Sequence, residues 1–125
     1  MKFNIITIFP EIFSSYFNES IIKKAQEKKV ISIKIHNLRD FTNDKRHTVD
    51  DTIYGGGAGM LLKIEPLYKA IKKIAKGKKI ANQKIILLSA KGKKWDQSLA
   101  KKYSKLKNIT LICGRYEGVD DRIKN

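Results

Sequence analysis

The sequence is poor in the residues that build covalent cross-links and metal sites. Its 125 residues contain one cysteine, Cys113, and two histidines, His36 and His47. A single cysteine excludes an intramolecular disulfide and any multi-cysteine metal site, and the two histidines lack metal-ligand spacing. Structural zinc is therefore not expected. Because Cys113 ends a predicted buried strand, we interpret it as a core residue rather than a nucleophile.

Long apolar runs and a cleavable signal pattern are also missing. No segment approaches the length that crosses a bilayer, and the N-terminus leads directly into a strand-like segment. We therefore expect a cytoplasmic protein with no membrane partner. With 42% hydrophobic residues, the chain is expected to form a single α/β domain over residues 1–125 with a substantial core.

Negative charge is scarce in one part of the chain. The formal net charge is +15, and residues 63–108 carry fifteen Lys or Arg against two Asp or Glu. Residues 1–62 and 109–125 carry only +2 and 0. Such a one-sided segment favours a polyanionic partner, most often a nucleic acid. The alternative is the codon bias of an AT-rich genome, since lysine supplies 23 of the 27 cations.

The pattern of apolar residues predicts an α/β fold. Continuous or alternating apolar residues predict strands over 3–9, 30–38, 84–89 and 108–113. Helical spacing predicts a helix that follows Pro10 and reaches Ala25, and further helices over 66–75 and 96–106. This alternation implies a mainly parallel sheet with helices on both faces. Residues 39–62 show no periodicity, which is typical of a functional loop or of disorder.

Two side-chain placements follow from these patterns. In the helix over 66–75, the side chains expected to point inward are Leu67, Tyr68, Ile71 and Ile74. His36 lies on the polar face of an alternating strand and is expected to be an ordinary surface residue.

Glycine is concentrated in one short segment. Four of the eight glycines are Gly55, Gly56, Gly57 and Gly59, preceded by Tyr54. Such a cluster is costly to order unless the backbone approaches a ligand closely or adopts positive φ. The alternative is a flexible linker, although the flanking residues are aromatic and aliphatic rather than serine or charged. The spacing excludes a P-loop and breaks the dinucleotide-binding fingerprint.

A second candidate site lies where two predicted strands end. Residues 89–92 (Ser-Ala-Lys-Gly) follow the third strand, and residues 114–118 (Gly-Arg-Tyr-Glu-Gly) follow the fourth. Ligands bind beyond the carboxyl ends of the strands in open parallel sheets, so we expect these segments to be neighbours at a ligand site. Two ordinary turns are the alternative.

Six segments together form a pattern that extends over the whole chain. They are residues 9–13, 39–41, 49–51, 54–60, 88–89 and 113–120. In order and spacing they resemble the bacterial tRNA (guanine-N1)-methyltransferases of the SPOUT superfamily. The resemblance implies methylation of the guanine 3′ of the anticodon, with S-adenosylmethionine as the donor. It also implies a SPOUT α/β fold with a C-terminal trefoil knot, in a homodimer with active sites at the subunit interface.

The resemblance assigns roles to individual residues. The residues that would hold the donor are Leu88, Ser89, Ala90, Gly114, Tyr116, Glu117 and Gly118. Those that would surround the target guanine on the tRNA side are Asp50, Tyr54, Gly55, Gly56, Gly57 and Gly59. Glu117 would face either the amino group of the donor or a Mg²⁺ ion.

The resemblance covers about the first half of the family's length. It implies that the general base, an aspartate, and a neighbouring arginine follow Asn125, so no catalytic residue is expected within residues 1–125. The trefoil knot is expected to be incomplete here, and the C-terminal tRNA-binding domain lies outside these residues. The chain alone is therefore expected to be inactive and to bind the donor weakly. The alternative function is a non-catalytic basic RNA-binding or dimerisation module.

Overall fold

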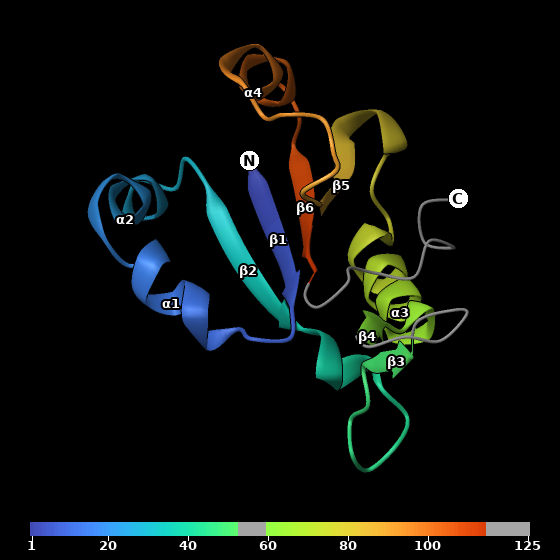
Figure 1. Cartoon of the computed structure of the whole chain (residues 1–125). Helices are drawn as coiled ribbons and strands as arrows, with labels where there is room; N and C mark the ends of the chain where they lie inside the picture. The colour runs from blue at the N-terminus through green and yellow to red at the C-terminus, as the bar shows by residue number, and fades with distance from the viewer. Residues whose placement is uncertain (53–59, 115–125) are drawn as a thin grey trace.

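The computed structural model describes residues 1–52 and 60–114, and only the backbone of residues 50–52 and 60–61 within that range. Its centre is a four-stranded sheet in the order β2-β1-β6-β5, and all three pairings are parallel (Figure 1). The strands are β1 (Lys2–Thr7), β2 (Ser32–Asn37), β5 (Gln83–Leu88) and β6 (Asn108–Cys113). The predicted α/β architecture with a parallel sheet is confirmed, and the last strand has the predicted bounds.

The central strands are buried because both of their faces are covered. Residues 4–8 of the first strand and its continuation are all buried, as are Ile109, Thr110 and Ile112 of β6. Parallel strands covered on both faces read as continuous apolar runs, which explains why the sequence located these two strands well. The edge strand β2 instead alternates between exposed and half-buried side chains from Ser32 to Ile35.

One face of the sheet packs against helix α3 (Ile64–Ala75). Ile6 and Ile112 are paired in register on the central strands, and they share a core cluster with Leu67, Ala70 and Ile74 of α3. The spacing of these three helical residues is the stripe that an amphipathic helix turns towards a core. Gly77 follows α3 with φ of +76°, a conformation that favours glycine and ends the helix.

The placement of Tyr68 was predicted wrongly. Its side chain is 57% exposed, and the Lys72 ammonium lies 5.9 Å from the ring centroid. The buried stripe passes through Leu67, Ala70 and Ile74, so the next residue after Leu67 is rotated by about 100° towards solvent. The aromatic character of Tyr68 therefore does not indicate burial.

The opposite face of the sheet is flanked by α2 (Ser20–Glu27) and α4 (Gln97–Tyr103). Phe3, whose side chain points away from the α3 face, lines a groove of about 850 Å³ together with Gln26 of α2 and Leu106, which follows α4. Asp96 is the N-cap of α4, and its carboxylate accepts a hydrogen bond of 2.8 Å from the Leu99 amide. The prediction of helices on both faces is thus confirmed.

The single helix predicted after Pro10 is two helices, α1 (Glu11–Phe17) and α2. Glu19 is extended at φ −127° and ψ 152°, and Ser20 has a positive φ of 54°, so the helical path is interrupted between them. The Gln26 side-chain amide donates a hydrogen bond of 2.7 Å to the Phe17 carbonyl oxygen. This bond satisfies a carbonyl at the end of α1 and holds the two helices together.

Residues 39–62 contain regular structure that the sequence pattern did not reveal. A 3₁₀ turn, η1 (Leu38–Phe41), is followed by β3 (Asp50–Thr52) and β4 (Met60–Leu62), which pair antiparallel. Three-residue strands are too short to produce a periodic signal. Val49, which precedes this hairpin, and Leu62, its last residue, are 0% and 1% exposed, so burial rather than periodicity fixes the position of the hairpin.

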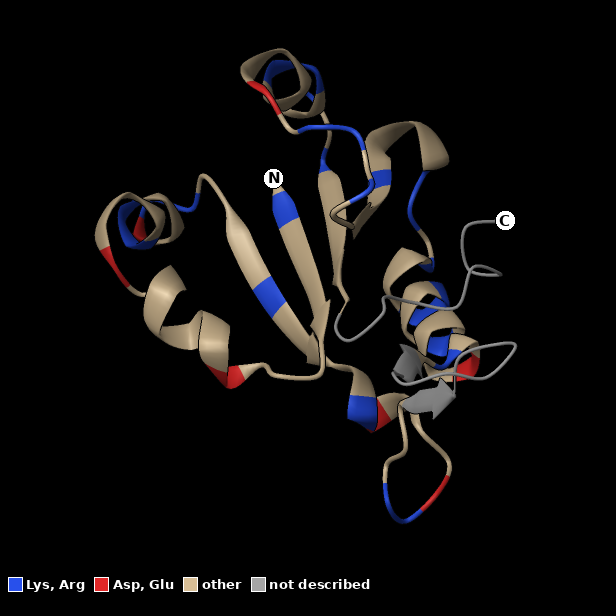
Figure 2. Ribbon diagram, in the orientation of Figure 1, with Lys and Arg blue, Asp and Glu red and all other residues tan. Residues whose placement is uncertain are grey.

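Ionic contacts contribute little to this fold. Among the side chains described, those of residues 1–49 and 62–114, one ion pair forms, between Lys69 Nζ and Glu65 Oε1 at 3.3 Å on the surface of α3. Figure 2 shows how far the basic residues outnumber the acidic ones along α3, α4 and the loop before α4. Exposed pairs of this kind stabilise a helix by only about 0.3–0.5 kcal/mol, so apolar packing carries the stability.

Replacing Leu67 by alanine is expected to lower the free energy of unfolding by about 2–5 kcal/mol, because it would leave a cavity in the core. Replacing the adjacent Tyr68 by alanine is expected to cost less than about 1 kcal/mol, because that side chain is exposed. Urea denaturation followed by circular dichroism measures both changes. Equal losses in the two variants would contradict the orientation of α3.

Candidate functional site

The carboxyl ends of β5 and β6 leave the sheet side by side. Leu88 and Cys113 are register partners at the last position of the two strands. Ser89 and Gly114 therefore begin neighbouring loops, as the sequence predicted, and both are exposed. Leu88 is 47% exposed, which leaves an apolar side chain at the edge of the sheet.

The loop after β5 turns tightly around Ser89. The Lys91 amide donates a hydrogen bond of 3.2 Å to Ser89 Oγ, and the Gly92 amide donates one of 3.2 Å to the Ser89 carbonyl oxygen. Ala90, between them, is exposed. These bonds give the segment the geometry of a serine turn, which holds the Ser89 backbone in a defined position at the sheet edge.

The hairpin β3–β4 brings the two ends of the glycine segment together. Asp50 pairs with Leu62 across the hairpin, and the Lys63 amide donates a hydrogen bond of 2.6 Å to the Val49 carbonyl oxygen. The backbone of Asp50 is thereby fixed at the base of the hairpin. Residues 53–59, which include Tyr54, Gly55, Gly56, Gly57 and Gly59, lie outside the described residues.

One core cluster joins the hairpin to the sheet edge. Val49 and Leu62 belong to the same cluster as Ile112, and Leu87 packs against it. Leu87 and Ile112 are the residues directly before the ends of β5 and β6. The hairpin that carries the glycine segment and the edge that carries Ser89 and Gly114 are thus anchored in the same apolar cluster. The sequence pattern did not predict this proximity.

The loop between η1 and the hairpin is held by its own side chains. Arg39 Nη1 donates a hydrogen bond of 3.3 Å to the His47 carbonyl oxygen, and Thr48 donates its amide and hydroxyl to the Asp44 carboxylate. The bonds from Thr48 keep the pKa of the exposed Asp44 carboxyl below its usual value. This arrangement was not predicted from the sequence, although the four-residue spacing of Asp44 and Thr48 is a signal that indicates it.

His36 is not the ordinary surface residue that was predicted. Its ring is half-buried on the α3 side of the sheet, and Nε2 lies 2.9 Å from Asn4 Oδ1. Burial, followed by the positive charges of Lys34 and Lys2, lowers the pKa of the imidazole. A neutral ring held by a buried asparagine serves packing and hydrogen bonding. In register, His36 lies level with Ile6 and Ile112, two strands away from β6.

Within the described ranges, no three His, Cys, Asp or Glu side chains converge as metal ligands. Glu117, Tyr116 and Gly118 lie outside those ranges, so their predicted roles toward the donor or Mg²⁺ remain predictions. Among the helices described, none combines the length and apolar character needed to cross a membrane.

The match to known proteins extends from the first residue to the last. A sequence model of the family described as tRNA (Guanine-1)-methyltransferase TrmD matches residues 1–125. The chain belongs to this family. Named tRNA (guanine-N(1)-)-methyltransferases include relatives from Dictyoglomus turgidum and Clostridioides difficile. Each is 50% identical to the present chain, and the matches cover 100% and 98% of the present chain respectively.

The family membership agrees with the fold. The crystal structure of a tRNA (m1G37) methyltransferase from Aquifex aeolicus superposes with a TM-score of 0.88 at 38% identity over 99% of this chain. The chain spans about half the length of these relatives: 49% of the Dictyoglomus protein, 53% of the Clostridioides protein and 55% of the Aquifex chain. The predicted resemblance and the SPOUT-type α/β fold are therefore confirmed.

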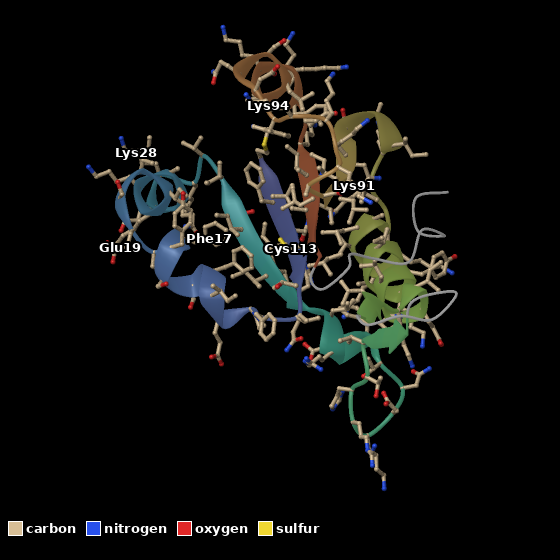
Figure 3. The ribbon with its side chains drawn as sticks, viewed as in Figure 1. Phe17, Glu19, Lys28, Lys91, Lys94 and Cys113 are labelled. Atoms are coloured by element: carbon tan, nitrogen blue, oxygen red, sulfur yellow. The ribbon has the colours of Figure 1, made fainter. Side chains whose placement is uncertain are left out.

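Cys113 is the last residue of β6 and is labelled in Figure 3. The reactivity of its thiol tests how accessible this edge of the sheet is to solvent. Burial raises the pKa of this thiol, so less of it is the reactive thiolate than in an exposed cysteine. We expect Ellman's reagent to modify Cys113 more slowly in the folded chain than in the chain unfolded by guanidinium chloride, at the same mildly alkaline pH. Equal rates, with Cys113→Ser as the blank, would show that the end of β6 is open.

Proposed function

We propose that residues 1–125 are the donor-binding and guanine-positioning part of a tRNA (guanine-N1)-methyltransferase. The reaction would transfer a methyl group from S-adenosylmethionine to N1 of the guanine 3′ of the anticodon. The observation that carries the proposal is the pairing of Leu88 with Cys113, which starts the two predicted donor loops side by side in a chain of this family.

The described residues at this edge fit a donor that is recognised without strong charges. Leu88 offers exposed apolar surface, while Ser89, Ala90 and Gly114 offer backbone groups and one hydroxyl. Such neutral groups can bind an adenine and ribose beside a sulfonium without placing a second positive charge near it. The donor, when bound, supplies a methyl group on a positively charged sulfur. Tyr116, Glu117 and Gly118 are proposed to complete the pocket.

The guanine is proposed to lie between this edge and the glycine segment. The shared core cluster of Val49, Leu62 and Ile112 supports the idea, because it anchors both parts to one rigid body. Asp50, Tyr54, Gly55, Gly56, Gly57 and Gly59 are proposed to contact the tRNA around the base. N1 must lose its proton as the methyl arrives, and the general base is proposed to come from outside residues 1–125.

Several wider features are part of the same proposal. We infer a cytoplasmic homodimer, with tRNA as partner and with active sites at the subunit interface. Residues 1–125 would form a single α/β domain, with the trefoil knot incomplete within them. Mg²⁺ is proposed as a second cofactor with Glu117 as its ligand, because a carboxylate oxygen is the donor that this ion prefers.

A complementation assay tests the methyl transfer. We expect a mixture of this chain with a separately made second half of the Dictyoglomus turgidum relative to form N1-methylguanosine in tRNA, detected by mass spectrometry of the nucleosides. Gly114→Val should reduce the rate about a hundredfold, because a side chain would displace the donor from its reacting position. No N1-methylguanosine from the mixed halves would contradict the proposal.

A matched glycine provides the control for this assay. Gly92 lies in the loop after β5, and a Cβ there would meet the Ser89 carbonyl oxygen at 3.4 Å, an ordinary contact. Gly92→Ala should therefore keep near-normal activity. Glu117→Ala separates the enzyme from a non-catalytic RNA-binding module. Loss of activity in a variant that is still folded supports the assignment as an enzyme. Salt-dependent tRNA binding that is the same with and without the substitution supports the non-catalytic RNA-binding module.

A further inference from the structure

An exposed tryptophan lies in the lysine-rich loop between β5 and α4. Trp95 directly precedes the N-cap of α4, and its side chain is 50% exposed. Its ring meets that of Tyr103 at a centroid distance of 5.7 Å and an angle of 53°. This tilted contact leaves the indole without a parallel ring partner among the described aromatic pairs. About half of the surface of Trp95, the largest type of aromatic residue, therefore remains exposed to solvent.

The segment that carries these two rings is strongly basic. Residues 84–107 contain eight lysines and one carboxylate, Asp96. All eight lysines are exposed, and Asp96 already accepts the capping hydrogen bond from Leu99. The Lys84 ammonium lies 5.7 Å from the centroid of the Tyr103 ring. Figure 3 shows Lys91 and Lys94 along the loop that leads from β5 to α4.

The ring pair lies towards the start of β5, although Trp95 belongs to the same β5–α4 loop that begins at Ser89. Trp95 contacts Tyr103, and Tyr103 contacts Lys84 near the start of β5. Leu88, where the donor loop begins, lies four residues further along the same strand, or about 13 Å away. A contact at Trp95 would therefore not occupy the space proposed for the donor or the guanine.

We infer that Trp95, Tyr103 and the surrounding lysines form a stacking platform for single-stranded RNA. An unpaired base would stack on the indole, while lysine ammonium groups would contact the adjoining phosphates. Base stacking on aromatic side chains is insensitive to sequence because every base has a π-face. The charge of the segment favours a polyanion, and the exposed indole favours one that carries bases. The inference rests on the proposed function in that it takes RNA as the partner.

The tryptophan itself reports the contact. Trp95 is the only tryptophan in the chain, so its fluorescence can be assigned without labelling. We expect a short single-stranded RNA of mixed sequence to quench this fluorescence at low salt. In parallel, anisotropy of a dye on the RNA measures total binding. Trp95→Ala should weaken binding by about fivefold to a hundredfold, and Trp95→Phe should recover much of the loss.

Two controls isolate stacking from charge and from folding. Tyr68 on α3 is also exposed and lies beside a lysine, so Tyr68→Ala removes a comparable ring elsewhere and should leave RNA binding unchanged. Heparin, a polyanion without bases, should bind the Trp95→Ala variant as well as it binds the unaltered chain. Circular dichroism verifies that each variant is folded.

The outcomes separate this inference from the proposed function. One outcome is that RNA binds without changing the Trp95 fluorescence, and binds the Trp95→Ala variant as tightly as the unaltered chain. This outcome would overturn the stacking platform but leave tRNA as a partner. Absence of RNA binding in every variant would overturn the platform and the RNA partner together. Methylation in the complementation assay at saturating tRNA should persist in Trp95→Ala, since the indole contacts Tyr103 and is not among the residues proposed to hold the donor.

Discussion

The parallel pairing of β1 with β6 and of β6 with β5 is the constraint on which the rest of the molecule depends. Because the strands point in one direction, their loops of chemical interest emerge at one edge, and because Ile6 and Ile112 share a face, α3 has an apolar surface to cover. The helix in turn packs against η1 and so holds the approach to the hairpin. A change in register at this point would move every candidate residue at once.

The parts of the fold that local physics determines were predictable from the sequence. β6 is a continuous apolar strand with cover on both faces, and its bounds were predicted as observed. Gly77 and Asp96 mark helix ends through conformations and hydrogen bonds that few other residues provide. The neighbouring positions of Ser89 and Gly114 followed from strand direction alone, together with the rule that places ligands at the carboxyl ends of parallel strands.

The parts that depend on contacts between distant segments were not predictable. Val49 and Leu62 form the base of a hairpin only because both enter a core that also contains Ile112. Glu19 interrupts a helix whose apolar spacing continues without a break, and His36 is half-buried beside Asn4 on the next strand, whose Oδ1 accepts a hydrogen bond from its ring. A linear pattern contains no information on partners of this kind. Of the site, the sheet edge followed from strand order, whereas its proximity to the hairpin required the folded core.

The scarcity of ion pairs among the described residues has a consequence for how the protein responds to its medium. With Lys69–Glu65 as the one such pair among the side chains described, the lysines there mostly repel one another, and mobile anions relieve that repulsion. Added electrolyte therefore favours the compact chain while it releases a bound polyanion. Ionic strength would then act in opposite directions on folding and on the proposed RNA binding, so a high-salt wash that strips nucleic acid is expected to leave this molecule folded.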